Sequence, residues 1–253
     1  FAVWRGKHVT YVKPFPISVA PEFVDDPPAI SREECLERLG VATEFLGVGV
    51  ERVDYTKGLP ERFLALRRFF ERHPEYRERL TFVQLAAPSR GRIPRYRELQ
   101  DEVHATVEAV NGALATRTWR PIVYLERHHD RRDIWPLYRY ADFCVVSSLH
   151  DGMNLVAKEF VSVRDDDDGV LILSRFTGAA RELRDALLVN PYDLDETADA
   201  IRAALEMPPA ERSGRMGRMR RHVREHNIYR WAGLLVGDLA RIPQEAAVVS
   251  RAS

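Results

Sequence analysis

Two cations on one short loop could bind a phosphate. Arg52 and Lys57 follow an apolar segment and lead into a predicted helix. An arginine can hold a phosphate with two parallel hydrogen bonds, while a lysine supplies a compact point charge. Gly58 permits a sharp turn or a close approach to a ligand. The residue types leave a second interpretation open, a surface loop whose cations pair with Glu51 and Asp54.

A second loop has the features of a helix start that binds an anion. Gly152 permits a tight turn after a strand, and a helix is expected to begin near Asn154. Backbone amides in the first turn of a helix lack partners inside the helix, so those of residues 152–155 could bind a diphosphate. The sequence therefore predicts a phosphate site at this turn.

Two carboxylates flank the same turn. Asp151, just before the helix, could accept hydrogen bonds from sugar hydroxyls, and Glu159 lies one turn after Leu155 on the same face. A carboxylate there could accept both hydroxyls of a ribose. In the alternative interpretation Asp151 only caps the helix and Glu159 is a solvated helix residue.

Two common nucleotide-binding motifs are absent from the sequence. The sequence contains neither a Walker loop nor a Gly-x-Gly-x-x-Gly fingerprint, which argues against an ordinary ATPase and a Rossmann dehydrogenase.

Arg90 follows a strand and could point into the same cleft as the two loops, although an exposed arginine usually has no such role. His128 and His129 are adjacent on a loop without further spaced ligands, so we expect polar surface there and no metal.

The elements that must position these loops alternate along the chain. Apolar strands alternate with helices, which predicts an α/β fold with a doubly wound parallel sheet and a ligand beyond the carboxyl ends of its strands. The six expected strands are residues 44–50, 80–86, 121–125, 142–147, 170–174 and 186–189. The expected helices are residues 31–39, 60–72, 94–116, 131–140, 154–163, 178–184, 195–206, 209–225 and 228–242. Residues 8–20 should form a short strand and a proline-rich connector.

Composition narrows the function classes further. The 253 residues carry 38 basic and 38 acidic side chains, which argues against a broad nucleic-acid surface. The acidic run 165–168 is expected to be a solvated loop. Cys144 should be a buried hydrophobic residue, and two cysteines form no disulfide framework, which predicts a cytoplasmic setting. No apolar stretch is long enough for a membrane span. The chain lacks an initiator Met and a signal peptide, and is expected to begin in mid-fold.

Two long motifs carry a family resemblance. Residues 50–63 (VERVDYTKGLPERF) and 151–160 (DGMNLVAKEF) closely resemble the donor-site motifs of trehalose-6-phosphate synthases, a family of retaining glycosyltransferases. Shorter matches occur at residues 89–91, 139–142 and 190–193, and the similarity runs from about residue 8 to residue 242.

The resemblance implies a fold of two Rossmann-like domains facing across a cleft, the GT-B architecture. The N-terminal domain of this family holds glucose 6-phosphate, and the C-terminal domain holds UDP-glucose. By this resemblance, residues 1–20 are the end of the N-terminal domain and a linker. Residues 21–227 are the nucleotide-sugar-binding domain, and residues 228–253 are the helix that crosses back, with a tail.

The resemblance also implies roles for individual residues. Arg52 and Lys57 would contact the donor pyrophosphate, assisted by the backbone amides of Asn154 and Leu155. Glu159 would hold the ribose. The transferred glucose would be held by Asp151 and by the amides of Gly152 and Met153. Arg90, together with Lys57, would reach the acceptor phosphate.

The implied reaction joins glucose to glucose 6-phosphate through an α,α-1,1 bond and releases UDP with retention of configuration. No residue of the chain is a persuasive covalent nucleophile, so we expect front-face displacement without a metal or cofactor. Arg52, Lys57 and Asp151 are the expected catalytic residues, since the two cations would stabilise charge growing on the pyrophosphate. The family's N-terminal domain supplies a glycine loop, acceptor contacts and a histidine that have no counterpart in this sequence. We therefore expect the chain to bind UDP or UDP-glucose but barely to turn over alone.

Two other functions remain open at this stage. A related glycosyltransferase with another acceptor, such as a glucosylglycerol-phosphate synthase or a pseudo-glycosyltransferase, would share this domain. A non-catalytic domain that binds nucleotide-sugar is the other alternative, although the intact Arg52, Lys57, Asp151 and Glu159 argue against it. The sequence determines neither the donor base nor the oligomeric state, and a homo-oligomer remains open.

Overall fold

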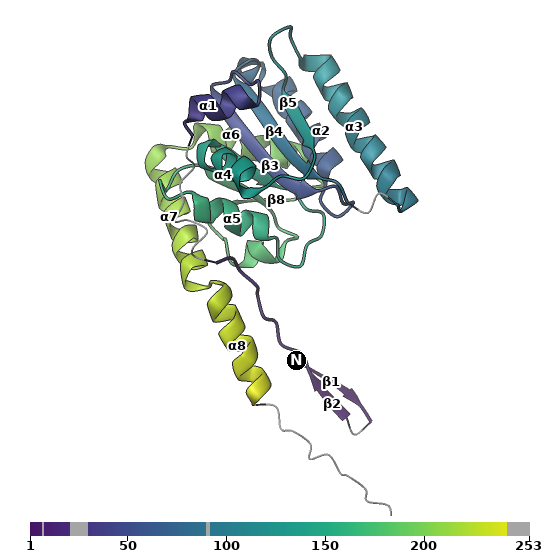
Figure 1. Cartoon of the computed structure of the whole chain (residues 1–253), viewed down its shortest axis with the longest axis vertical. Helices are drawn as coiled ribbons and strands as arrows, with labels where there is room; N and C mark the ends of the chain where they lie inside the picture. Colours follow the sequence, from purple (N-terminus) through teal and green to yellow (C-terminus); the bar gives the residue numbers. More distant parts are fainter. Residues whose placement is uncertain (7, 21–29, 90–91, 242–253) are drawn as a thin grey trace, which may run out of the picture.

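The structure is a computed structural model that describes residues 1–6, 8–20, 30–89 and 92–241. One α/β body contains most of these residues, and an arm projects from it (Figure 1). Within the described residues, no helix is long and apolar enough to span a membrane.

The body is built on a six-stranded sheet in which every pair of neighbouring strands is parallel. The strands are β3 (Phe45–Arg52), β4 (Leu80–Ala87), β5 (Ile122–Glu126), β6 (Phe143–Val146), β7 (Val170–Ser174) and β8 (Leu187–Val189). Their order across the sheet is β5-β4-β3-β6-β7-β8. All six predicted strands are present, and the predicted fold class is confirmed.

Helices cover both faces of the sheet. One hydrophobic cluster lies under α1 (Arg32–Arg38), α4 (Arg131–Tyr140), α5 (Leu155–Val163) and α7 (Pro209–Glu225). The other lies under α2 (Leu59–Arg72), α3 (Pro94–Leu114) and α6 (Leu194–Glu206). The described part of the body also contains the 3-10 turns η2 (Pro74–Tyr76) and η3 (Gly178–Arg181). The second occupies the start of the helix predicted at residues 178–184.

The strand order reverses between β3 and β6. The chain builds outward from β3 through β4 to β5, and then returns to the other side of β3 with β6. At such a switch point the two connecting loops diverge and leave a crevice at the carboxyl ends of the strands. The two loops that the sequence singles out follow these two strands, so the topology brings them to one place.

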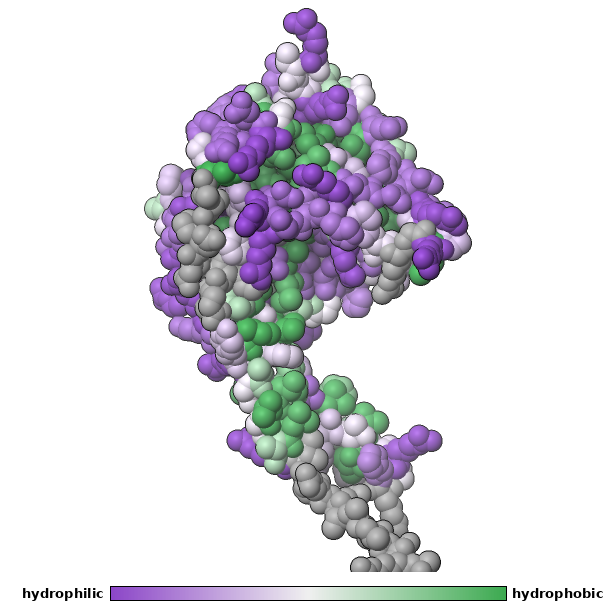
Figure 2. All heavy atoms as spheres, in the orientation of Figure 1, coloured by the Kyte–Doolittle hydropathy of each residue, from purple (hydrophilic) through white to green (hydrophobic). Residues whose placement is uncertain are grey.

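The arm consists of a hairpin, an extended connector and the last helix. β1 (Ala2–Arg5) pairs antiparallel with β2 (His8–Tyr11), so the structure adds a strand that the sequence pattern did not reveal. Helix α8 (Ile228–Ala240) has no buried residue, and Figure 2 shows hydrophobic residues gathered along this arm. The predicted boundary at residue 228 coincides with the start of α8, while the predicted boundary between residues 20 and 21 falls beside residues outside the described part. The division into domains stays a prediction.

Three backbone carbonyls attach the connector to the body and to α8. The carbonyl of Phe15 accepts a hydrogen bond from Trp231 Nε1 at 3.0 Å, and that of Val19 accepts one from the Ile228 amide at 3.1 Å. Between them, Ile17 O accepts a hydrogen bond from the buried Lys158 Nζ at 2.9 Å. Since these carbonyls belong to alternate residues, one edge of the connector is bound along its length.

Two local predictions have mixed outcomes. Cys35 and Cys144 are both free and buried, as expected for Cys144. The acidic run 165–168 is partly exposed, but it is not merely a solvated loop, since each of its carboxylates pairs with an arginine of a neighbouring element. The arginines are Arg139, Arg164, Arg212 and Arg220.

Candidate functional site

Two loops that follow β3 and β6 meet through an ion pair. Lys57 Nζ lies 2.7 Å from Asp151 Oδ2 and 3.4 Å from Glu51 Oε2. The side chains of Lys57 and Asp151 are only 13% and 18% exposed. The lysine is therefore held between two carboxylates, one from the end of β3 and one from the loop after β6. The alternative of a plain surface loop accounts for the contact with Glu51 but not for the contact with Asp151.

The local sequence forces Lys57 into this place. The Thr56 amide and hydroxyl both donate to Asp54 Oδ1, at 3.0 and 2.8 Å, which closes a tight turn before Lys57. Gly58 then adopts a φ of 62°, and a Cβ atom there would lie 2.4 Å from Ser147 O. Only glycine fits this position, because the backbone is left-handed and the loop after β6 passes directly against it.

Asn154 forms the start of α5. Its Oδ1 accepts a hydrogen bond from the Ala157 amide at 3.0 Å, and its Nδ2 donates to Asp151 Oδ2 at 3.1 Å. The predicted helix start is confirmed. The unusual conformation of this turn falls on Asn154, with a φ of 78°, and not on Gly152, where a Cβ atom would meet nothing within 4 Å. The chain bends at Gly152, while the left-handed conformation is adopted by Asn154.

Most backbone amides of this turn are free to bind a ligand. The amides of Gly152, Asn154 and Leu155 donate to no described residue. The Met153 amide donates to Asp151 Oδ1 at 3.3 Å, so this member of the predicted set is already engaged in the free protein. Three unpartnered amides beside the positive end of a helix have the donors that an anion requires.

The charges around Lys57 shift one another's pKa values. Burial lowers the pKa of Lys57, but the Glu51 and Asp151 carboxylates together raise it above its ordinary value. For Asp151, burial opposes ionisation, yet the hydrogen bond and charge of Lys57 lower its pKa. Burial raises the pKa of Glu51 against the opposing charges of Arg62 and Lys57. The pair Lys57 and Asp151 is thus stabilised in its charged form, while burial disfavours the charged form of Glu51 and the two cations oppose this effect.

The other predicted site residues have fewer contacts with the rest of the described structure. Arg52 is exposed and makes no hydrogen bond or ion pair with a described residue, although its charge acts on Asp54. Glu159 is partly buried and also lacks a hydrogen-bond partner among the described residues. Burial raises the pKa of Glu159, while the charge of Arg131 opposes this. Arg90 lies outside the described residues.

Sequence reasoning missed the polar layer beneath the site. The side chain of Arg62 on α2 is 1% exposed, and it donates to Ser147 Oγ at 2.9 Å and to Gln84 Oε1 at 2.7 Å. Its Nη2 lies 3.6 Å from Glu51 Oε1. A signal was present in the sequence, because Arg62 interrupts the apolar stripe that α2 buries against the sheet.

A large hollow opens beside Asp151. It has a volume of about 790 Å³ and is bounded by the connector and by the loops after β6 and β7. Its lining includes Asp151, Gly152, Met153, Arg181 and the exposed Phe176. This volume suits a ligand of the size of a nucleotide sugar or one of its halves.

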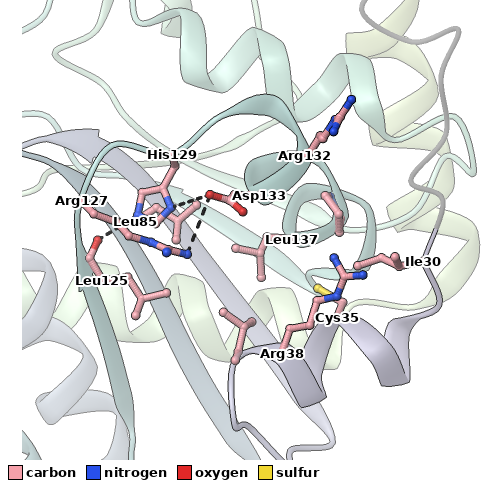
Figure 3. Close-up of a pocket in the computed structure, with 12 residues that line it drawn as sticks. Ile30, Cys35, Arg38, Leu85, Leu125, Arg127, His129, Arg132, Asp133 and Leu137 are labelled. Atoms are coloured by element: carbon pink, nitrogen blue, oxygen red, sulfur yellow. Dashed lines mark hydrogen bonds and ion pairs between the residues drawn. The ribbon is translucent and has the colours of Figure 1, made fainter.

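A smaller hollow of about 80 Å³ lies between α1 and α4 (Figure 3). His129 lines it, with Nε2 at 3.1 Å from Leu125 O and Nδ1 at 3.4 Å from Asp133 Oδ2. The expectation that both adjacent histidines form polar surface is wrong for His129, whose side chain is 4% exposed. Apolar side chains such as Leu85 and Leu137 line the same hollow, which holds a few water molecules at most. Among the described residues, no group of three or more His, Cys, Asp or Glu could hold a metal ion.

The model of one protein family matches almost the whole chain. Residues 3–241 match glycosyltransferase family 20. The chain belongs to this family. The match includes both loops of the ion pair and the arm, so the family 20 relationship covers every element described above.

Curated relatives of this family 20 chain are trehalose-6-phosphate synthases. One from Klebsiella pneumoniae subsp. pneumoniae is 45% identical over 194 residues, which cover 76% of this chain and 41% of the relative. One from Cronobacter sakazakii is 39% identical over 249 residues, which cover 94% of this chain and 52% of the relative. The chain thus spans about half the length of the curated relatives that it matches.

Solved structures share the fold closely. An alpha,alpha-trehalose-phosphate synthase (UDP-forming) from Burkholderia xenovorans, in complex with glucose-6-phosphate, superposes with a TM-score of 0.89 at 36% identity. The superposition covers 94% of this chain and 54% of that one. An E. coli structure bound with UDP-2-fluoro glucose gives 0.88 at 34% identity and covers 96% and 56%. The GT-B relationship expected from the sequence is confirmed.

Proposed function

We propose that this chain is the donor-binding half of a retaining glucosyltransferase. The enzyme would transfer glucose from UDP-glucose to glucose 6-phosphate and yield trehalose 6-phosphate and UDP. The observation that carries this proposal is the meeting of Lys57, Asp151 and the bare start of α5 at the switch point of the sheet. A cation and unpartnered amides that suit a diphosphate lie next to a carboxylate that suits sugar hydroxyls.

Each group has one task in this proposal. Lys57 and Arg52 bind the diphosphate oxygens, and the amides of Asn154 and Leu155 bind the same oxygens from the other side. Asp151 and the amides of Gly152 and Met153 hold the glucose, which requires Met153 to exchange its bond with Asp151 for one with the sugar.

The nucleoside and acceptor ends have separate partners. The partly buried Glu159 accepts hydrogen bonds from both ribose hydroxyls, which offsets the cost of its burial. Arg90 holds the acceptor phosphate together with Lys57. The ligands of the two solved relatives, glucose-6-phosphate and UDP-2-fluoro glucose, support this choice of substrates.

The free structure suggests how the donor enters. Lys57 is bound to Asp151 before any ligand arrives, so the diphosphate must take over the lysine. That exchange frees Asp151 for sugar hydroxyls at the moment the donor is in place. One event then prepares both the leaving group and the sugar, which is the pre-organisation that transfer requires.

The chemical step needs no covalent intermediate with this chain. The bond between the anomeric carbon and the diphosphate oxygen breaks, and a bond from the acceptor hydroxyl oxygen forms on the same face. The acceptor proton passes to the leaving diphosphate oxygen, so that oxygen does the work of a general base. Lys57 and Arg52 stabilise the negative charge that grows on the diphosphate.

Titration calorimetry with UDP tests the proposal directly. The chain should release heat on binding UDP, with weaker binding of ADP and GDP at equal concentration. Incubation with UDP-glucose and glucose 6-phosphate should give very slow formation of trehalose 6-phosphate, because the acceptor contacts are expected in another domain. An absence of binding heat with all three nucleotides would remove the proposed function.

A further inference from the structure

Glu51 is the one buried carboxylate of the site that touches three different elements. Its side chain is 2% exposed and lies within 3.6 Å of Lys57, Arg62 and Asn154. These residues belong to the loop after β3, to α2 and to the cap of α5. Because its side chain is sealed from solvent, Glu51 can act on a ligand only through its neighbours.

Lys57 has two anionic partners with different access to solvent. Asp151 lines the large hollow, and a ligand can reach it. Glu51 lies 3.4 Å from the same Nζ atom on the protected side. Once a diphosphate has taken over the lysine and Asp151 has turned to the sugar, Glu51 is the carboxylate that still holds Lys57.

The position of Glu51 is itself fixed by Arg62 on α2. Arg62 Nη2 lies 3.6 Å from Glu51 Oε1, and the rest of the guanidinium is bound by Ser147 and Gln84. A Cβ atom at Gly49 would lie 2.6 Å from Arg62 Nη1 and 2.4 Å from Gln84 Oε1. The strand therefore has room for this layer only because residue 49 is glycine. A carboxylate held in this way cannot follow the lysine if the lysine moves.

We propose that Glu51 is a positioning residue for diphosphate binding, which keeps the ammonium group of Lys57 in place while its second partner changes from Asp151 to phosphate. Asn154 Nδ2 lies 3.5 Å from Glu51 Oε1, at the limit of a hydrogen bond, so Glu51 also contacts the cap of α5. The inference rests on the proposed function, because it needs a diphosphate at Lys57.

The test must separate positioning from stability, because removal of Glu51 alone leaves the buried Arg62 without its anion and could prevent folding. Glu51→Gln is therefore made in the unaltered chain, because it keeps the shape of the side chain and leaves Arg62 bound by Ser147 and Gln84. Thermal melting reports whether this variant folds, and the double change Arg62→Met with Glu51→Gln, which removes the buried cation together with the carboxylate, is the second variant. UDP affinity is measured by calorimetry for each, with and without Lys57→Ala.

The expected result is a coupling between Glu51 and Lys57. Glu51→Gln should weaken UDP binding at least about tenfold when Lys57 is present. In the Lys57→Ala background the same change should alter the affinity by less than about twofold. A loss of equal size in both backgrounds, or no loss when Lys57 is present, would overturn the inference.

A control variant excludes a general effect of losing a buried carboxylate. Asp142→Asn removes the charge of a partly buried carboxylate at the opposite end of the sheet, where Oδ2 accepts a hydrogen bond from the Leu46 amide at 2.7 Å. It should leave UDP affinity unchanged. Absence of UDP binding by the unaltered chain would overturn the proposed function together with this inference, whereas binding without the coupling would overturn only the role of Glu51.

Discussion

Lys57 and Asp151 are 94 residues apart in the chain, yet Lys57 Nζ donates to Asp151 Oδ2 at 2.7 Å. The pair joins the loops on the two sides of the switch point, so it marks the place where the sheet opens to a ligand. In the free protein the ion pair occupies the groups that the proposed donor would use. Binding of the proposed donor must therefore replace the contact between Lys57 and Asp151. The contribution of each residue to the affinity for UDP can then be measured by substitution.

Lys57→Ala should abolish most of the affinity for UDP. Removing one member of a partly buried, hydrogen-bonded charge pair typically costs about 2–5 kcal/mol, and the diphosphate would lose its main cation. Calorimetry with UDP gives the difference directly. Lys13→Ala is the matched control, because Lys13 pairs with Asp238 on the exposed arm and should leave the affinity unchanged. A change within error for Lys57→Ala would contradict its assigned role.

Glu159→Gln should stabilise the protein and weaken UDP binding at the same time. Burial raises the pKa of Glu159, so the folded state binds this proton more tightly than the unfolded state, whose value is near 4.5. Stability is therefore lost as the pH rises from 4.5 through the folded-state pKa, and the ionised carboxylate is unfavourable at neutral pH. The glutamine variant should melt at a higher temperature at pH 7, with a gain that vanishes below pH 4.5.

The control for this prediction is Glu108→Gln on α3, an exposed glutamate. It should change neither the melting temperature nor the UDP affinity. Unaltered UDP affinity in Glu159→Gln would argue against a ribose contact, and a lower melting temperature at pH 7 would contradict the unfavourable burial of the carboxylate.

Asn154→Gly should affect binding more than stability. Glycine tolerates the φ of 78° and costs roughly a few tenths of a kcal/mol as a helix cap, but it removes the bond from Nδ2 to Asp151. UDP affinity should fall, while urea unfolding should change little. Asn227→Gly removes the corresponding cap of α8, where the side chain accepts hydrogen bonds from two amides. It should match the stability change without loss of affinity, and equal affinities in both variants would refute the role of Asn154.

Gly58→Ala should destabilise the protein more than Gly40→Ala. Both glycines are left-handed, with φ values of 62° and 63°, which costs any other residue about 1–2 kcal/mol. A Cβ atom at Gly40 would meet nothing within 4 Å, whereas one at Gly58 would lie 2.4 Å from Ser147 O. The excess cost at Gly58 should appear in urea unfolding together with a loss of UDP affinity. Equal losses of stability would show that the loop after β6 can move aside.

Local patterns explain why so much of the fold could be predicted. The apolar strands and the helix starts at Ser31 and Asn154 depend on residues that are neighbours in the chain, and the structure confirms them. The hairpin strand β1 was missed because its side chains are mostly exposed and show no alternation toward a core. His129 was misjudged because its burial depends on how α4 packs against the sheet and α1, which no local pattern indicates.

The sequence by itself determined the fold class and pointed to Arg52, Lys57, Asp151 and Glu159, because periodicity and motifs are properties of adjacent residues. Only the tertiary structure decided which charges meet. It brought Glu51 and Lys57 to Asp151 and Asn154, about a hundred residues away, and placed Arg62 beneath them. The physical reason is that these contacts follow from the order of strands in the sheet and from the space that packing leaves, and neither is encoded within any single stretch of the chain.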